Sequence, residues 1–199
     1  MLTIAAKATV TVSVFVNAQR STAHLAFIAL KTEIAVHAFT FSEQRFAGRD
    51  ELREQVLTLC RQARREVLIL SHQLDPYSYN RIEVYEALKQ LALRSPKASV
   101  RILLQDNEPV RRSGHRLLEL AQRLSSRVLI HRPHLQEHRD LAENLLVVDE
   151  TGYLRQPIHS RPEGSAACNQ RGRARELAHQ FETIWQQSEP DSLLRRLSI

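Results

Sequence analysis

Four short apolar runs, separated by segments of helical or loop character, constrain the fold of this chain more than any other feature. They lie at residues 67–70, 100–104, 127–130 and 145–148. Continuous runs of this length that are rich in Val, Ile and Leu are typical of strands buried on both faces. Apolar residues also recur at helical spacing at about 50–63, 81–93, 113–124 and 170–187. This alternation predicts an α/β layered fold, with a mixed and mostly parallel sheet flanked by helices.

The composition is that of a globular domain with an added N-terminal segment. Of the 199 residues, 43% are apolar and 25% are charged, and no apolar run approaches the roughly 18 residues that a membrane span needs. Residues 1–40 contain no Gly or Pro, and 9–16 (TVTVSVFV) alternates like a strand or, less well, matches an export signal. We therefore divide the chain into an extension of uncertain structure at 1–40 and a domain at 41–199, and we expect it to be cytoplasmic.

The charge is basic and is carried almost wholly by arginine. The formal net charge is +6, from 24 Arg and 4 Lys against 22 acidic residues. Because the planar guanidinium pairs well with phosphate, an acidic partner is one interpretation, and an ordinary solvated surface is the other. The chain has only two cysteines, Cys60 and Cys168, and their wide separation disfavours a disulfide framework or a cysteine zinc site.

Polar residues follow the predicted strands at the edge where ligands bind in open α/β sheets. His72 and Asp75 follow the first strand, Asp106 follows the second, and Arg155 follows a turn after the fourth. The loop after Asp106 adds Arg111, Arg112 and His115. These seven side chains are our candidate ligand contacts, since His can carry protons near neutral pH and Arg can neutralise phosphate. As ordinary loop residues, the aspartates would instead form turns and caps.

No metal, cofactor or nucleophile motif is found. His131, His134 and His138 have helical spacing, but Pro133 interrupts the helix that would align them. The sequence contains no phosphate-binding G-x-x-x-x-G-K-[ST], no dinucleotide G-x-G-x-x-G and no G-x-S-x-G elbow. We therefore predict no bound metal and no cofactor.

The segment from Asn144 onwards resembles the phospholipase D superfamily, whose signature is H-x-K-x-x-x-x-D followed by G-S-x-x-N. The run Asn144-Leu-Leu-Val-Val-Asp149 is followed by Gly164-Ser165 and later by a basic helix. Residues of about 42–199 are similar to an uncharacterised bacterial phospholipase D-like domain that often follows an acetyltransferase domain. The segments that carry this similarity are Leu70-Ser-His-x-Leu-Asp-Pro76, Gly114-His-Arg-Leu-Leu118 and Trp185-x-x-Ser-x-Pro190-Asp.

The chain departs from that signature where the family's chemistry takes place. Counting back from Asp149 puts Asn144 at the lysine position and Ala142 at the histidine position. In the active enzymes the histidine attacks phosphorus while the lysine neutralises the phosphate, and alanine and asparagine can do neither. Only Asp149 and the Gly164-Ser165 step remain, so the resemblance implies a retained fold without phosphodiesterase chemistry.

Three functions follow from these observations. The first is a non-catalytic phospholipase D-like module that binds a phosphate-bearing ligand, or that serves as a docking or dimerisation domain for an acetyltransferase. The resemblance also implies a homodimer, because single units in this superfamily often pair. The second is a rebuilt hydrolase site, in which Asp75 or Asp106 orients His72 or His115. The third, ranked last, is nucleic-acid binding through Arg171, Arg173 and Arg175.

Overall fold

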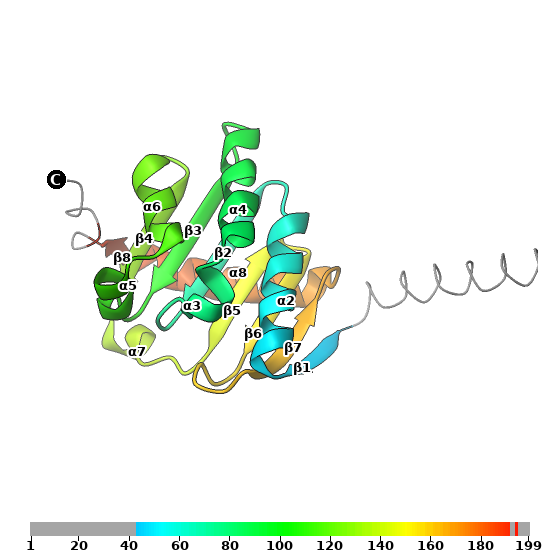
Figure 1. Ribbon diagram of the computed structural model, residues 1–199. Coiled ribbons are helices and arrows are strands. Elements are labelled where there is room, and N and C mark those ends of the chain that lie inside the picture. The colour runs from blue at the N-terminus through cyan, green and yellow to red at the C-terminus, as the bar shows by residue number, and fades with distance from the viewer. Residues whose placement is uncertain (1–42, 192–193, 195–199) are drawn as a thin grey trace, which may run out of the picture. The chain divides into compact units, whose positions relative to one another are not determined.

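An eight-stranded mixed sheet forms the centre of the domain in the computed structural model, which describes residues 43–191 and 194 (Figure 1). The order across the sheet is β1-β7-β6-β5-β2-β3-β4-β8. The strands are β1 (Gln44–Ala47), β2 (Glu66–Ser71), β3 (Ser99–Leu104), β4 (Val128–Pro133), β5 (Asn144–Val148), β6 (Gly152–Gln156), β7 (Glu163–Ala167) and β8 (Ser188–Pro190). The N-terminal extension predicted at 1–40 lies outside the described residues.

The pairing confirms the α/β class and the mixed sheet, but the expectation of mostly parallel strands is wrong. Of the seven pairings among the described strands, only β2 with β3 and β3 with β4 are parallel. The helices α4 and α6 cross back between these three strands, which parallel pairing requires. The connections from β5 to β6 and from β6 to β7 are too short for such a crossover, so those strands turn back as an antiparallel meander.

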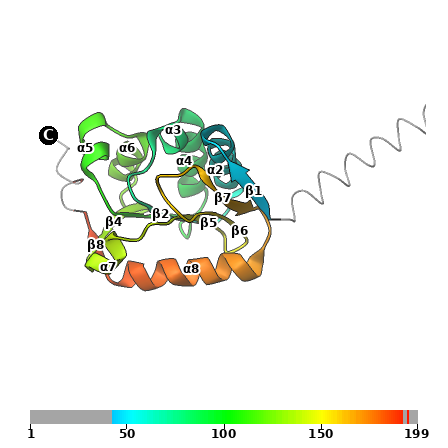
Figure 2. The ribbon, with the colours of Figure 1, turned by 90° about the horizontal axis from the view of Figure 1, so that it is seen from below.

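Helices cover both faces of the sheet, as Figure 2 shows. The helices are α2 (Arg49–Gln62), α3 (Pro76–Tyr79), α4 (Ile82–Arg94), α5 (Glu108–Ser113), α6 (Arg116–Arg123), α7 (Gln136–Arg139) and α8 (Arg171–Gln186). Helices α2 to α6 lie on one face and α8 on the other. The helix predicted at 113–124 begins only at Arg116, as α6. The segment before it, predicted as a loop, forms the separate short helix α5, which ends where Gly114 adopts a φ of 70°.

The strand alternation explains the two cores. On β2, Val67 and Ile69 face α2 and α4, whereas Leu68 and Leu70 pack with Phe181 of α8. These five side chains are almost fully buried. The continuous apolar run of β2 therefore supplies both layers, as expected for a strand covered on both faces. Among the described residues, no helix has the length and apolar character to span a membrane.

Candidate functional site

A cavity of about 510 Å³ opens where β2 ends and β5 begins. Asn144, the first residue of β5, lines it together with residues from the end of β2 and from the loop between β6 and β7. Its polar lining includes Arg49, His72, Asp75, Asn144, Gln156 and His159. The cavity thus forms around the residue that the resemblance places at the family's lysine position.

Asn144 joins two neighbouring segments through its side-chain amide. Its Oδ1 accepts a hydrogen bond from the backbone N–H of His72 at 2.9 Å, and its Nδ2 donates to Gln156 Oε1 at 3.0 Å. Gln156, which is 4% exposed, then donates to the carbonyls of His159 and Arg161. Because an ammonium group cannot accept the His72 N–H, a lysine could not make the first of these bonds. The amide therefore holds the loops around the cavity in place.

Two histidines stack inside the cavity. The ring centroids of His72 and His159 lie 4.1 Å apart with an interplanar angle of 19°. The His72 ring is held by Gln105, whose Oε1 lies 3.2 Å from His72 Nδ1. Burial lowers the pKa of His159 below its usual value, and the nearby His72 lowers it further. The backbone N–H of His159 also donates to Ala142 O at 2.6 Å, so this histidine lies beside the residue that the resemblance aligns with the phospholipase D nucleophile.

Asp75 borders the same cavity but has a structural task. It caps the short helix α3, where its carboxylate accepts from the Tyr77 N–H at 3.4 Å and from the Ser78 hydroxyl at 2.8 Å. Arg49 Nη2 pairs with the same carboxylate at 3.3 Å. His72 and Asp75 are therefore brought together as predicted, but neither orients the other in the hydrogen bonds of the structure.

The remaining candidates from the second loop do not line this cavity. Asp106 accepts from the side chain of Gln73 at 2.8 Å, which ties the two strand-end loops together. Arg111 and Arg112 both pair with Glu108, at 3.0 and 2.8 Å. Helix α5 thus turns these arginines back onto their own carboxylate.

His115 is buried at 2% exposure and lies outside the cavity. Its Nδ1 accepts the Leu117 N–H at 3.1 Å and so caps α6. Burial lowers the pKa of His115 to about 4, and the imidazole is neutral at pH 7. The structure gives His115 a capping task, and its hydrogen bonds involve neither Asp75 nor Asp106.

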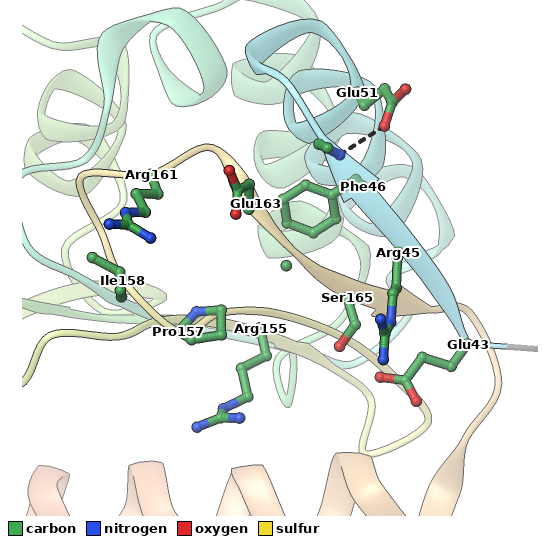
Figure 3. Close-up of a pocket in the computed structure, with 12 residues that line it drawn as sticks. Glu43, Arg45, Phe46, Glu51, Arg155, Pro157, Ile158, Arg161, Glu163 and Ser165 are labelled. Atoms are coloured by element: carbon green, nitrogen blue, oxygen red, sulfur yellow. Dashed lines mark hydrogen bonds between the residues drawn. The ribbon is translucent and has the colours of Figure 1, made fainter.

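Arg155 and the Gly164-Ser165 step lie at a second cavity, of about 590 Å³, formed by β1, β7 and the loop before β7 (Figure 3). Arg155 points away from that loop and pairs with Glu143 at 2.9 Å. A Cβ on Gly164 would lie only 2.1 Å from Arg155 O, so glycine is needed for β7 to approach β6. The Ser165 hydroxyl hydrogen bonds to Glu43, and this bond lowers the pKa of that carboxyl.

Asp149 lies at the other end of β5 from Asn144. Its carboxylate accepts the backbone N–H groups of Arg64, Arg65 and Glu66, each at 2.8 Å, and its own backbone has a φ of 53°. Asp149 therefore fastens the connection between α2 and β2. It takes no part in the cavity at Asn144.

The described residues contain no group of three or more His, Cys, Asp or Glu side chains placed to hold a metal ion. His131 stacks on Trp185 at 4.0 Å and lies 3.0 Å from the Ser188 hydroxyl, so it is part of the packing around α8.

His159 lines this cavity although nothing in the sequence suggests it, and the same holds for Arg49 and Gln156. His159 belongs to no motif and follows a strand by three residues. Only the pairing of β5 with β6, which places Gln156 beside Asn144, brings its loop to the cavity. To predict from the sequence that His159 reaches the cavity, one would need to know the register between β5 and β6.

Comparisons with solved structures show the same fold. The chain is similar to Nuc, a phospholipase D family member from Salmonella typhimurium, with a TM-score of 0.54 and 11% identity over 75% of this chain and 97% of that one. NucT from Helicobacter pylori has a TM-score of 0.52 and 11% sequence identity, over 75% of this chain and 99% of NucT. TrmBL2, an archaeal chromatin protein that binds DNA, has a TM-score of 0.57 and 12% sequence identity, over 86% of this chain and 65% of TrmBL2.

Sequence comparison gives the family. No curated protein matches the sequence. A family model described as a domain of unknown function (DUF7931) matches residues 48–197, which include all the described helices and every strand of the sheet except β1. The chain therefore belongs to the DUF7931 family and has a phospholipase D-like fold.

Proposed function

We propose that the domain is a non-catalytic phospholipase D-like module that binds a phosphate-bearing ligand in the cavity at Asn144. The observation that carries this proposal is the stacked pair of His72 and His159 in a polar cavity, beside an alanine at the family's nucleophile position. The cavity offers two imidazole groups to an anion, and the guanidinium of Arg49, which is shared with Asp75. Its carboxylate, Asp75, is already occupied by Arg49 and by the cap of α3.

The geometry favours binding over turnover. In-line displacement at phosphorus needs an attacking and a departing group on opposite sides of the phosphorus atom. Two rings stacked at 4.1 Å leave no room for a phosphorus atom between them. The rebuilt hydrolase in which an aspartate orients a histidine is also disfavoured, because His72 bonds to Gln105 and His115 to Leu117.

Phosphate binding is expected to depend on pH in a defined direction. Burial and the nearby His72 lower the pKa of His159 below its usual value, so the His159 imidazole of the free cavity is largely neutral at pH 7. An anion favours the imidazolium form, so binding takes up a proton and strengthens as the pH falls towards and below 6.5. A ligand at 100 times its Kd would stabilise the protein by about 2.7 kcal/mol.

The test is thermal unfolding with inorganic phosphate, glycerol phosphate and nucleoside monophosphates at pH 6 and pH 8. We expect the melting temperature to rise more at pH 6, and the rise to disappear in His159→Ala. The matched control is His179→Ala, which removes an exposed imidazole from α8. Phosphodiesterase turnover that is lost in His72→Ala would support the rebuilt hydrolase instead, and no shift at millimolar phosphate would refute the cavity as a phosphate site.

The docking roles rest on the resemblance alone. A homodimer would be detected by light scattering during size-exclusion chromatography, and an acetyltransferase partner by co-purification with a tagged form of the domain. A monomer at all accessible concentrations would remove the dimer proposal without affecting the cavity.

A further inference from the structure

Three loops converge at the end of the sheet opposite the Asn144 cavity. They are residues 63–65, 95–98 and 124–127, which precede β2, β3 and β4 (Figure 1). The Ser99 N–H donates to Arg65 O at 3.0 Å, and the Val100 N–H donates to Arg127 O at 2.8 Å. Neighbouring strands lie about 4.8 Å apart, so the first and third loops are separated by about 10 Å. The three loops therefore form one continuous surface.

This surface collects five cations that lie far apart in the sequence. We call it the basic pole, and it consists of Arg64, Arg65, Arg94, Lys97 and Arg127. Four of these residues are exposed and Arg127 is partly exposed. Among residues 43–191, none of the five side chains forms an ion pair.

Two acidic side chains at this end are paired with cations outside the basic pole, Glu66 with Arg101 at 3.0 Å and Glu150 with Arg175 at 3.4 Å. Asp149 accepts three neutral backbone N–H groups and keeps its charge. Among the described residues, the five cations therefore outnumber the one carboxylate at this end that is not paired with another cation.

Helix dipoles explain only part of this arrangement. The carboxyl ends of α2, α4 and α6 point to the basic pole, and a cation in the last turn of a helix stabilises it by about 0.3–1 kcal/mol. Of the five cations, only Arg94 lies in a last turn; Arg64, Arg65, Lys97 and Arg127 lie beyond the helix ends, where this effect fades. Like charges gathered on so small a surface repel one another, and a multivalent anion would relieve that repulsion.

The chemistry of the loops favours a nucleic-acid backbone over a lipid surface. Ser95, Ser125 and Ser126 lie among the cations, and Ser and Arg are common partners of phosphate oxygens. Leu93, 63% exposed on the adjoining turn of α4, is the one large apolar side chain strongly exposed next to these loops in the described structure. The loops contain no aromatic residue on which single-stranded bases could stack.

We propose that the basic pole binds the phosphate backbone of a nucleic-acid duplex, without reading its sequence. This site is separate from the phosphate cavity, which lies at the other end of the sheet. It also differs from the arginines of α8, where Arg173 pairs with Glu176 and Arg175 with Glu150. The domain would thereby hold two anionic partners at opposite ends.

The test measures fluorescence anisotropy of a labelled 20-base-pair DNA duplex at 50 and 200 mM salt. If each of the five cations neutralises one phosphate, affinity falls about 500-fold between these salt concentrations, from a logarithmic slope of about −0.9 per contact. In the triple variant Arg65→Gln, Lys97→Gln, Arg127→Gln, two contacts remain, and the fall is about 12-fold. At 50 mM salt this variant should bind at least 10-fold more weakly than the original protein.

The matched control removes the same charge elsewhere, through Arg45→Gln, Arg116→Gln and Arg161→Gln, which are all exposed and away from the basic pole. This control should keep the affinity within about twofold. Equal losses in the two triple variants, preference for phosphatidylserine vesicles, or no duplex binding at 50 mM salt would each overturn the proposal. Because the phosphate-induced melting shift reports on the cavity, it should survive in the basic-pole variant and keeps the two proposals distinguishable.

Discussion

Replacing Asp149 by alanine separates a structural role from a role in ligand binding. The carboxylate accepts three backbone N–H groups, from Arg64, Arg65 and Glu66, each at 2.8 Å. A hydrogen bond of this kind contributes about 1 kcal/mol net, so the three contribute about 3 kcal/mol. Water can partly replace them at a half-buried site, but alanine at a φ of 53° adds a cost of about 1 kcal/mol. We expect a total loss of about 3 kcal/mol.

Urea unfolding followed by circular dichroism measures this loss, and the melting temperature should fall by roughly 6–12 °C. Asp149→Asn keeps one acceptor and tolerates the positive φ, so it should lose about half as much. Glu150→Asn is the control, since it removes only an exposed ion pair with Arg175 and should change stability by less than about 0.5 kcal/mol. An Asp149→Ala protein with unchanged stability and abolished phosphate binding would refute our interpretation.

Three further experiments test other parts of the fold. Burial lowers the pKa of His115 from 6.5 to about 4, so the neutral imidazole stabilises the fold above pH 6.5. About 3 kcal/mol of this stability is lost as the pH falls from 6.5 to 4. The free energy of unfolding of His115→Asn, measured in urea, should therefore depend less on pH. Gly164→Ala should lose about 3 kcal/mol or more in the same assay, because its Cβ meets Arg155 O. Burial raises the pKa of Cys60 to about 12, so a thiol reagent should label half-buried Cys168 first and Cys60 only after unfolding.

Local patterns were sufficient to locate most of the sheet and helices. The apolar runs at 67–70, 100–104 and 145–148 fall within β2, β3 and β5, because their hydrophobicity is a local property of strands buried on both faces. Strand β1 gives no such signal, since Phe46 is its one buried residue. The strand directions also escaped prediction, because they depend on the lengths of connections and on which strands become neighbours.

Only part of the candidate site was predictable, namely the residues found by the rule that ligands bind beyond the carboxyl ends of strands in open α/β sheets. His72 and Asp75 follow a buried strand and line the cavity, as that rule predicts. Arg111 and Arg112 follow the next strand, but α5 turns them back onto Glu108. His159 arrives from a distant loop, and the cations of the basic pole lie on three separate connections. Such arrangements depend on tertiary structure and have no signature in a single stretch of sequence.

Strand β5 separates two tasks that a motif search counts as one. Asn144, at its beginning, borders the cavity, whereas Asp149, just past its end, fastens the connection between α2 and β2. A substitution at the beginning of the strand can therefore change the chemistry of the cavity without weakening the connection that Asp149 holds. In this chain the aspartate at that spacing fastens a junction, and its presence alone says nothing about chemistry at the other end of the strand.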